Sequence, residues 1–231
     1  RTNTEMKQIN VLHIIGSLQL GGAEKSLLLL LQNIDRAKFN PVVVTMYSDG
    51  LNDFFSDDFC KLNIPLYHLH LKSWRDIETF RGLRQIIRRH RIDIAHSHYG
   101  ALEFFGTLYA RLAGVRHCVY TKHNLRFKTG LSFKLGRILL NRILTERILS
   151  ISQTVTEYLV DSEYASPSRI RLVYNPVENP KIPNAAHQAS IKQKWQIPTG
   201  QFIIGNTSRF DSSKGFDIFY LALKYLRKMG I

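Results

Sequence analysis

Short apolar runs recur along this chain and alternate with longer segments whose apolar residues return every three or four positions. A short continuous apolar run is typical of a strand buried on both faces, and the longer spacing is typical of an amphipathic helix. The pattern predicts strands at 9–15, 42–47, 64–69, 92–98, 118–121, 147–152 and 170–174. It predicts helices that begin near residue 23 and that cover 76–90, 103–113, 131–144 and 154–160.

This alternation predicts an α/β fold with a doubly wound parallel sheet and right-handed crossovers. Pro65 cannot donate a backbone hydrogen bond, so the third strand is expected at an edge of the sheet. We assign residues 1–178 to this first domain.

The composition changes after the seventh predicted strand. Residues 179–200 are interpreted as a linker with a short helix over 190–195. A strand at 202–206, a loop to Gly215 and a helix over 216–229 then repeat the earlier pattern, so residues 201–231 are interpreted as the incomplete start of a second domain. A single strand–helix unit cannot bury its apolar face unaided. The sequence is therefore expected to be a fragment.

A glycine-bearing loop joins the first strand to the first helix. Gly21 and Gly22 lie just before Glu24, where backbone N–H groups and the helix N-terminus favour an anion. The loop lacks the Gly-x-Gly-x-x-Gly fingerprint of dinucleotide sites and the glycines of a P-loop. From the glycines alone, a ligand loop and a plain tight connection remain equally open. Glu24 is read either as a cap of the helix N-terminus or as a substrate contact.

The net charge of +14 predicts a polyanionic neighbour: nucleic acid, an anionic membrane or a phosphorylated substrate. Nucleic acid is not expected, because no recognition motif accompanies the charge. Cys60 and Cys118 lack metal-ligand spacing and are interpreted as reduced thiols. No apolar stretch approaches the length of about 18 residues typical of a membrane span, and no signal peptide is expected.

Much of the positive charge lies in two regions. Both can be interpreted as solvated helix faces, and the second can also be interpreted as a segment lying on anionic lipid. The first region comprises Lys72, Arg75, Arg81, Arg84, Arg88, Arg89, His90 and Arg91. The second comprises Lys122, Arg126, Lys128, Lys134, Arg137, Arg142 and Arg147, interleaved with apolar residues between Phe127 and Ile143.

Six motifs, in this order, resemble the retaining glycosyltransferases of family 4, which have the GT-B fold of two Rossmann-like domains. The motifs are Gly-Gly-Ala-Glu after the first strand, Asp93-Ile94-Ala95-His96-Ser97-His98, Thr121-Lys122-His123-Asn124, Ser150-Ile151-Ser152-Gln153, Val173-Tyr174-Asn175-Pro176-Val177 and the segment from Gly205 to Phe216. The resemblance extends from Val11 to Gly230.

The resemblance implies that a nucleotide-sugar donor binds between two domains and that no metal ion takes part. Arg209 and Lys214 match the cations that clamp the donor diphosphate, whose charge grows as the glycosidic bond breaks. His123 matches the histidine near the donor sugar and the acceptor, so these three residues are the expected catalytic groups. Ser208 stands where the family usually has glycine, and the family's later pair of glutamates is absent from this sequence.

The expected substrate-binding residues are Gly21, Gly22, Glu24, His98 and Asn124, together with Arg209 and Lys214. His96 and His98 are placed after the fourth strand on one face. That spacing suits a metal, but the sequence places no third ligand nearby, so neither a metal site nor a cofactor is expected. A structural or acceptor-side role is preferred for both histidines.

The resemblance implies an enzyme that moves a sugar onto a glycan or lipid-linked acceptor in cell-surface polysaccharide or lipopolysaccharide assembly. The expected location is the cytoplasm, peripheral to the inner face of the cell membrane. The segment by itself is not expected to turn over substrate. A non-catalytic nucleotide- or glycan-binding remnant remains as an alternative, whereas a nucleotide-dependent oxidoreductase is disfavoured by the missing glycine fingerprint.

Overall fold

The computed structural model describes residues 7–48, 50, 52–73, 76–125, 130–179, 182–198, 200–201, 203–208, 210 and 214–230. Contacts within the chain divide it into two compact units, 1–179 and 180–231.

The first unit is built on one sheet of seven parallel strands in the order β3-β2-β1-β4-β5-β6-β7. The predicted α/β fold with a doubly wound parallel sheet is confirmed, and β3 lies at an edge as Pro65 indicates. The strands are β1 (Ile9–Ile15), β2 (Phe39–Thr45), β3 (Leu66–His68), β4 (Ile94–His98), β5 (His117–Lys122), β6 (Arg147–Ser150) and β7 (Ile170–Leu172).

Helices connect successive strands, as parallel pairing requires. In the first unit they are α1 (Gly22–Asn33), α2 (Ser56–Cys60), α3 (Ile77–Arg89), α4 (Leu102–Leu112), α5 (Leu131–Leu139) and α6 (Gln153–Asp161), with a 3₁₀ turn at Pro167–Arg169. The helix predicted over 131–144 changes at Leu140 into a π-helical turn, Leu140–Leu144. That turn buries Asn141, whose amide bonds to Tyr120 and to the backbone of residue 163.

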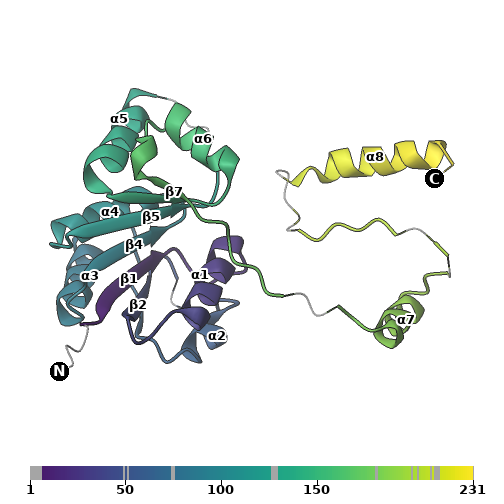
Figure 1. The fold of residues 1–231 in the computed structure, drawn as a ribbon, viewed down its shortest axis with the longest axis horizontal. Helices are drawn as coiled ribbons and strands as arrows, with labels where there is room; N and C mark the ends of the chain where they lie inside the picture. Colours follow the sequence, from purple (N-terminus) through teal and green to yellow (C-terminus); the bar gives the residue numbers. More distant parts are fainter. Residues whose placement is uncertain are drawn as a thin grey trace, which may run out of the picture. The chain divides into compact units, whose positions relative to one another are not determined.

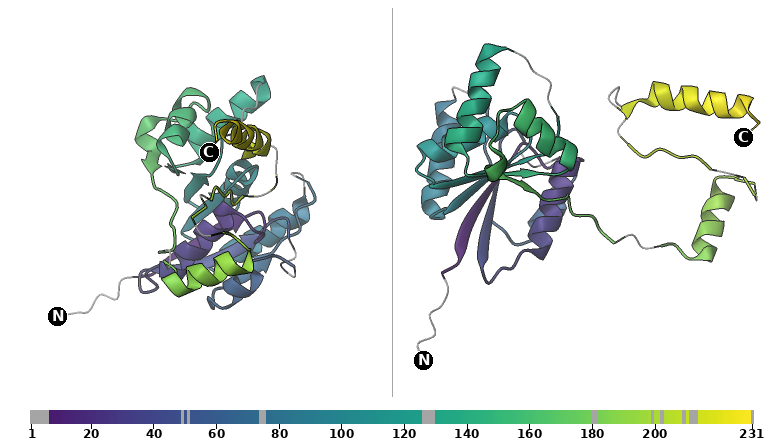
Figure 2. Two further views of the ribbon diagram at one scale, coloured as in Figure 1. Left: turned by 90° about the vertical axis from the view of Figure 1, so that its right-hand side faces the viewer. Right: turned by 45° about the horizontal axis from the view of Figure 1, so that its top comes forward.

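Apolar side chains cover both faces of the sheet. On one face, Leu27 and Leu31 of α1 pack with Phe59 of α2 against Val43 and Ile15. The opposite face buries residues of α3 and α4 against alternate positions of β1, β2 and β4. Figure 1 shows the strands fanning between these helices, and the right-hand view of Figure 2 separates α1 from α3 across the sheet.

The second unit contains α7 (Ala185–Lys194) and α8 (Phe216–Lys228), and neither helix buries a residue. The predicted strand at 202–206 is wrong over its described part, since residues 203–206 are not extended into a sheet. A parallel strand needs a neighbouring strand to accept its backbone hydrogen bonds. None is formed among the described residues of this unit.

Candidate functional site

A stripe of histidines lies on one face of the sheet near the carboxyl ends of its central strands. His13 of β1 pairs in register with His96 of β4, and His98 ends β4 on the same face. Thr121 of β5 lies beside His98, and His123 follows directly after β5. The strand order reverses between β1 and β4, and open α/β sheets bind ligands at the carboxyl end of such a switch point.

A cavity of about 400 Å³ opens beside this stripe within the first unit. Its wall combines three histidines, His96, His98 and His123, with the side of α1 and with the residues that follow β7. The remaining lining residues are Ser26, Leu27, Leu29, Leu30, Asn33, Thr121, Leu149, Val173, Tyr174, Asn175 and Pro176. A largely apolar cavity with a few convergent polar groups is the usual form of a small-molecule site.

The histidine side chains are buried and sparsely hydrogen-bonded. His13 Nδ1 lies 3.2 Å from His98 Nε2, and His96 Nε2 lies 2.8 Å from Thr121 Oγ1. Both ring nitrogens of His123 are buried without a partner among the described residues, as are His13 Nε2 and His98 Nδ1. Asn124 Oδ1 is likewise unpartnered. The unpartnered ring nitrogens of His98 and His123 and the Asn124 oxygen are candidates to hydrogen-bond a bound ligand.

Burial keeps the imidazole rings neutral. Desolvation lowers the pKa of His123 and that of His13 to about 4. Desolvation, and after it the neighbouring imidazoles, holds the pKa of His96 and His98 well below the usual value. A neutral ring carries one N–H donor and one acceptor nitrogen, so His123 can both donate to and accept from a substrate hydroxyl.

Two sequence-based expectations about His96 and His98 need correction. Both residues lie within β4 and not after it, in agreement with the strand predicted over 92–98, and His98 is its last residue. The expectation that no third ligand lies nearby is also wrong, because one ring nitrogen each of His13, His96 and His98 lie within 4.8 Å of one another. Sequence reasoning missed His13 because 83 residues separate it from His96.

The glycine loop is shaped by two carboxylates. A Cβ at Gly21 would lie 2.2 Å from Glu24 Oε2, so the absence of a side chain admits that carboxylate at the start of α1. Glu24 lies in the first turn of α1, where a negative charge is favourable to the helix N-terminus. Gly22 has open space around it. Asp53, which sequence reasoning missed, accepts hydrogen bonds from Leu18 N and Gln19 Nε2, both at 2.6 Å.

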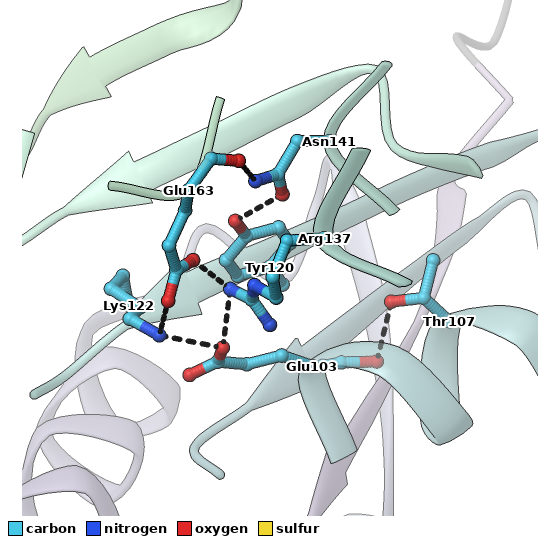
Figure 3. A network of polar contacts seen from close by, with 8 residues as sticks. Glu103, Thr107, Tyr120, Lys122, Arg137, Asn141 and Glu163 are labelled. Carbon is cyan, nitrogen blue, oxygen red and sulfur yellow. Dashed lines mark hydrogen bonds and ion pairs between the residues drawn. The ribbon is translucent and has the colours of Figure 1, made fainter. Parts of the chain in front are cut away.

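A buried network of four charges supports the end of β5 (Figure 3). Lys122 Nζ lies 3.0 Å from Glu103 Oε2 and 2.7 Å from Glu163 Oε1, and Arg137 binds the same two carboxylates. Lys122 and both glutamates are fully buried. Lys122 and Arg137 are therefore not members of the predicted basic surface, because their charges are paired inside the protein. Glu103 of α4, Arg137 of α5 and Glu163 after α6 are tied here to the residue that precedes His123.

Two of the predicted residues belong to the second unit. Lys214 is exposed in the second unit, and Arg209 lies outside the described residues. Cys60 and Cys118 are both unpaired. Across the described ranges, none of the helices combines the length and the apolar character that crossing a membrane requires.

Residues 20–179 match the model of Glycosyltransferase Family 4. Over 226 residues the chain is 22% identical to the UDP-Gal:alpha-D-GlcNAc-diphosphoundecaprenol alpha-1,3-galactosyltransferase of Escherichia coli. The aligned region covers 95% of this chain and 58% of the Escherichia coli protein. The chain thus spans less than two thirds of this relative's length.

Solved structures share the fold. A glycosyltransferase from Rickettsia africae superimposes with a TM-score of 0.76 at 18% identity, covering 96% of this chain and 58% of that one. Anabaena HepE, solved in complex with UDP-glucose, gives a TM-score of 0.74 at 17% identity, covering 94% and 57%. The family match spans most of the chain, and the sheet topology agrees with it. The chain belongs to Glycosyltransferase Family 4, with the GT-B type of fold.

Proposed function

We propose that this chain forms the acceptor-side part of a retaining glycosyltransferase that moves a sugar from a nucleotide-sugar donor to a glycan or lipid-linked acceptor. The observation that carries the proposal is the placement of His98 and His123 at the cavity, with ring nitrogens that have no partner among the described residues. In this proposal residues 1–178 are the acceptor-side domain, 179–200 the linker and 201–231 the start of the nucleotide-sugar domain.

Three groups would act on the donor. Arg209 and Lys214 stabilise the negative charge that grows on the diphosphate as it leaves, a role for which guanidinium and ammonium groups are suited. Gly22 leaves open space at the N-terminus of α1 for a phosphate, and the lack of a side chain at Gly21 admits the Glu24 carboxylate beside it. These cations and N–H groups replace a metal ion in stabilising the leaving group.

His123 would position the reacting hydroxyl. Its ring is neutral near pH 7, because burial lowers its pKa to about 4. It is therefore suited to hydrogen-bond donor and acceptor roles and not to cationic ones. Asn124 and His98 offer further unpartnered polar atoms beside it. Apolar side chains of α1 line the cavity beside these groups.

An exposed face of α5 and of the turn that follows it is suited to lie on a membrane that carries a lipid-linked acceptor. Leu131 is 72% exposed, Leu135 58% and Ile143 67%. Lys134 and Arg142 lie exposed among them. Apolar residues flanked by cations on one helix face are the pattern of a segment that lies on anionic lipid. We place the protein at the cytoplasmic face of a membrane, in cell-surface polysaccharide or lipopolysaccharide assembly; the Escherichia coli relative is named for a diphosphoundecaprenol-linked acceptor.

The test of the enzymatic proposal is a transfer screen on the longest natural protein that contains this chain. Sugar nucleotides of several bases are offered with membrane extract, with and without EDTA, and the product linkage is determined by NMR. We expect transfer with retained anomeric configuration that EDTA does not abolish. Arg209→Ala and Lys214→Ala should each lower the rate about 100-fold, the typical loss on removing a transition-state donor, whereas Lys224→Ala should not. Inversion, or no transfer from any donor, would contradict the proposal.

The membrane proposal is tested by vesicle flotation. The wild-type chain should float with vesicles that contain phosphatidylglycerol and much less with pure phosphatidylcholine. Leu131→Ser with Leu135→Ser should abolish flotation, and Leu20→Ser, which removes an exposed leucine far along the chain from α5, should not. Equal binding to neutral vesicles, or no effect of the α5 substitutions, would count against this surface.

A further inference from the structure

The parallel pairing of β1 with β4 brings three imidazoles together on one sheet face. His13 and His96 are register partners, and His98 lies two residues beyond His96, so all three side chains point to the same side. Their residues are 2%, 8% and 3% exposed. The rings of His96 and His98 lie 4.0 Å apart between centroids, and the ring of His13 lies 5.3 and 5.5 Å from them.

One pair of ring nitrogens has the spacing of two ligands on one metal ion, and the third ring lies close by. Two nitrogens bound to one tetrahedral zinc ion lie about 3.3 Å apart, given a metal–nitrogen distance of about 2.0–2.1 Å. His13 Nδ1 and His98 Nε2 already lie 3.2 Å apart, and nitrogens of all three rings fall within 4.8 Å. The sequence alone offered only the His96–His98 pair.

The imidazoles of this cluster can bind a cation by a change of tautomer alone. Of the two facing nitrogens of His13 and His98, one carries the hydrogen that the other accepts. When a cation takes both lone pairs, that hydrogen moves to the outer nitrogen of the same ring, and both outer nitrogens are free of partners among the described residues. The rings remain neutral imidazoles throughout, and no proton needs to leave.

We propose that His13, His96 and His98 form a binding site for one transition-metal dication of the zinc, nickel or copper type. Three imidazoles with no carboxylate suit these ions and disfavour Mg²⁺ and Ca²⁺, which prefer oxygen ligands. The contact of His96 Nε2 with Thr121 Oγ1 fixes the orientation of that ring, as outer partners of metal-bound histidines do. His96 and His98 line the cavity, which admits the ion and leaves room for a water molecule as a fourth ligand.

This site shares His98 with the acceptor cavity proposed above but not the groups proposed to bind the diphosphate, and its test does not depend on sugar transfer. The chain is freed of metal with a chelator and titrated with Zn²⁺ and with Co²⁺. We expect one equivalent of either ion, a rise in Tm and the strong visible absorption of four-coordinate Co²⁺. Binding of less than one equivalent, or the weak spectrum of six-coordinate Co²⁺, would overturn the proposal.

Substitutions locate the ion. His13→Asn and His98→Asn should each weaken Zn²⁺ binding by at least about 100-fold, because even outer partners of such ligands contribute about 10- to 100-fold. Thr121→Val, which removes no ligand, should weaken it by about tenfold and covers the case in which a histidine variant does not fold. His117→Asn is the control, since His117 is exposed and paired with Glu146. Loss of binding in His117→Asn, or undiminished binding in folded His13→Asn, would assign the ion to the surface instead.

Discussion

At the scale of single residues, buried polar side chains fix the loops at the carboxyl edge of the sheet. Asp53 is 9% exposed and accepts hydrogen bonds from Leu18 N, Gln19 Nε2 and Ser48 Oγ, the last at 2.5 Å. One carboxylate therefore ties the glycine loop to the segment after β2. The loop geometry depends on this residue as much as on the glycines.

Asp53→Ala should therefore lower the free energy of unfolding by about 3 kcal/mol, because several hydrogen bonds to a charged group are lost together. The exposed Asp57, in the first turn of α2, is the matched control, and Asp57→Ala should cost less than about 1 kcal/mol. Urea denaturation followed by circular dichroism measures both. A stability for Asp53→Ala equal to that of Asp57→Ala would show that the carboxylate does not hold the loop.

The sequence predicts a site residue only where a motif or pattern of neighbouring residues marks it. His98 and His123 were found because both fall within motifs that carry the family resemblance and lie near the ends of predicted strands, and both line the cavity. His13 was missed because its partners lie in β4, and no local sequence pattern shows which strands become neighbours in the sheet. Lys122 was misread as a surface cation because its partner Glu163 lies 41 residues away.

At the scale of elements, the buried charges hold three helices against the end of β5. Glu103 and Glu163 each bind both Lys122 and Arg137, so two positive and two negative charges balance. Balance matters because a buried charge without a partner is strongly destabilising. The π-helical turn after α5 adds Asn141, which bonds to Tyr120 and to the backbone of Glu163.

Glu163→Gln removes one charge while keeping the size of the side chain. We expect a loss of about 3–5 kcal/mol in the free energy of unfolding, the usual cost of breaking a buried pair from one side. Glu157→Gln on α6 is the control, because its carboxylate is exposed and accepts a hydrogen bond from its helix neighbour Gln153. Denaturant midpoints compare the two variants. A loss below about 1 kcal/mol for Glu163→Gln would mean that the network does not hold these helices.

Elements were predictable where the apolar pattern is long. All seven strands of the first unit were predicted, because each falls in a short apolar run of the sequence, although several ends differ by a few residues. The helix α2 was missed, since five residues with two aspartates show no helical spacing. The strand predicted at 202–206 failed for the opposite reason: its apolar residues suit a strand, but the sheet that would receive it is not formed by the described residues.

At the scale of the whole molecule, the strand order gathers residues that are remote in the sequence. β1, β4 and β5 are neighbours, so His13, His98 and His123 lie together toward the carboxyl ends of the central strands. Some cations lie in the interior, where Lys122 and Arg137 are neutralised, and others lie on exposed helix faces such as that of α3. The central claim is that the cavity end of β5 serves sugar transfer.

That claim is tested most directly by comparing the histidines at the two ends of β5 in the longest natural protein that contains this chain. His123 follows β5 at the cavity, and His117 begins the same strand at the other end, exposed and bonded to Glu146. His123→Ala should lower the rate of sugar transfer by about 100-fold with the fold unchanged, whereas His117→Ala should leave it within about twofold. Full activity in a folded His123→Ala variant would contradict the account.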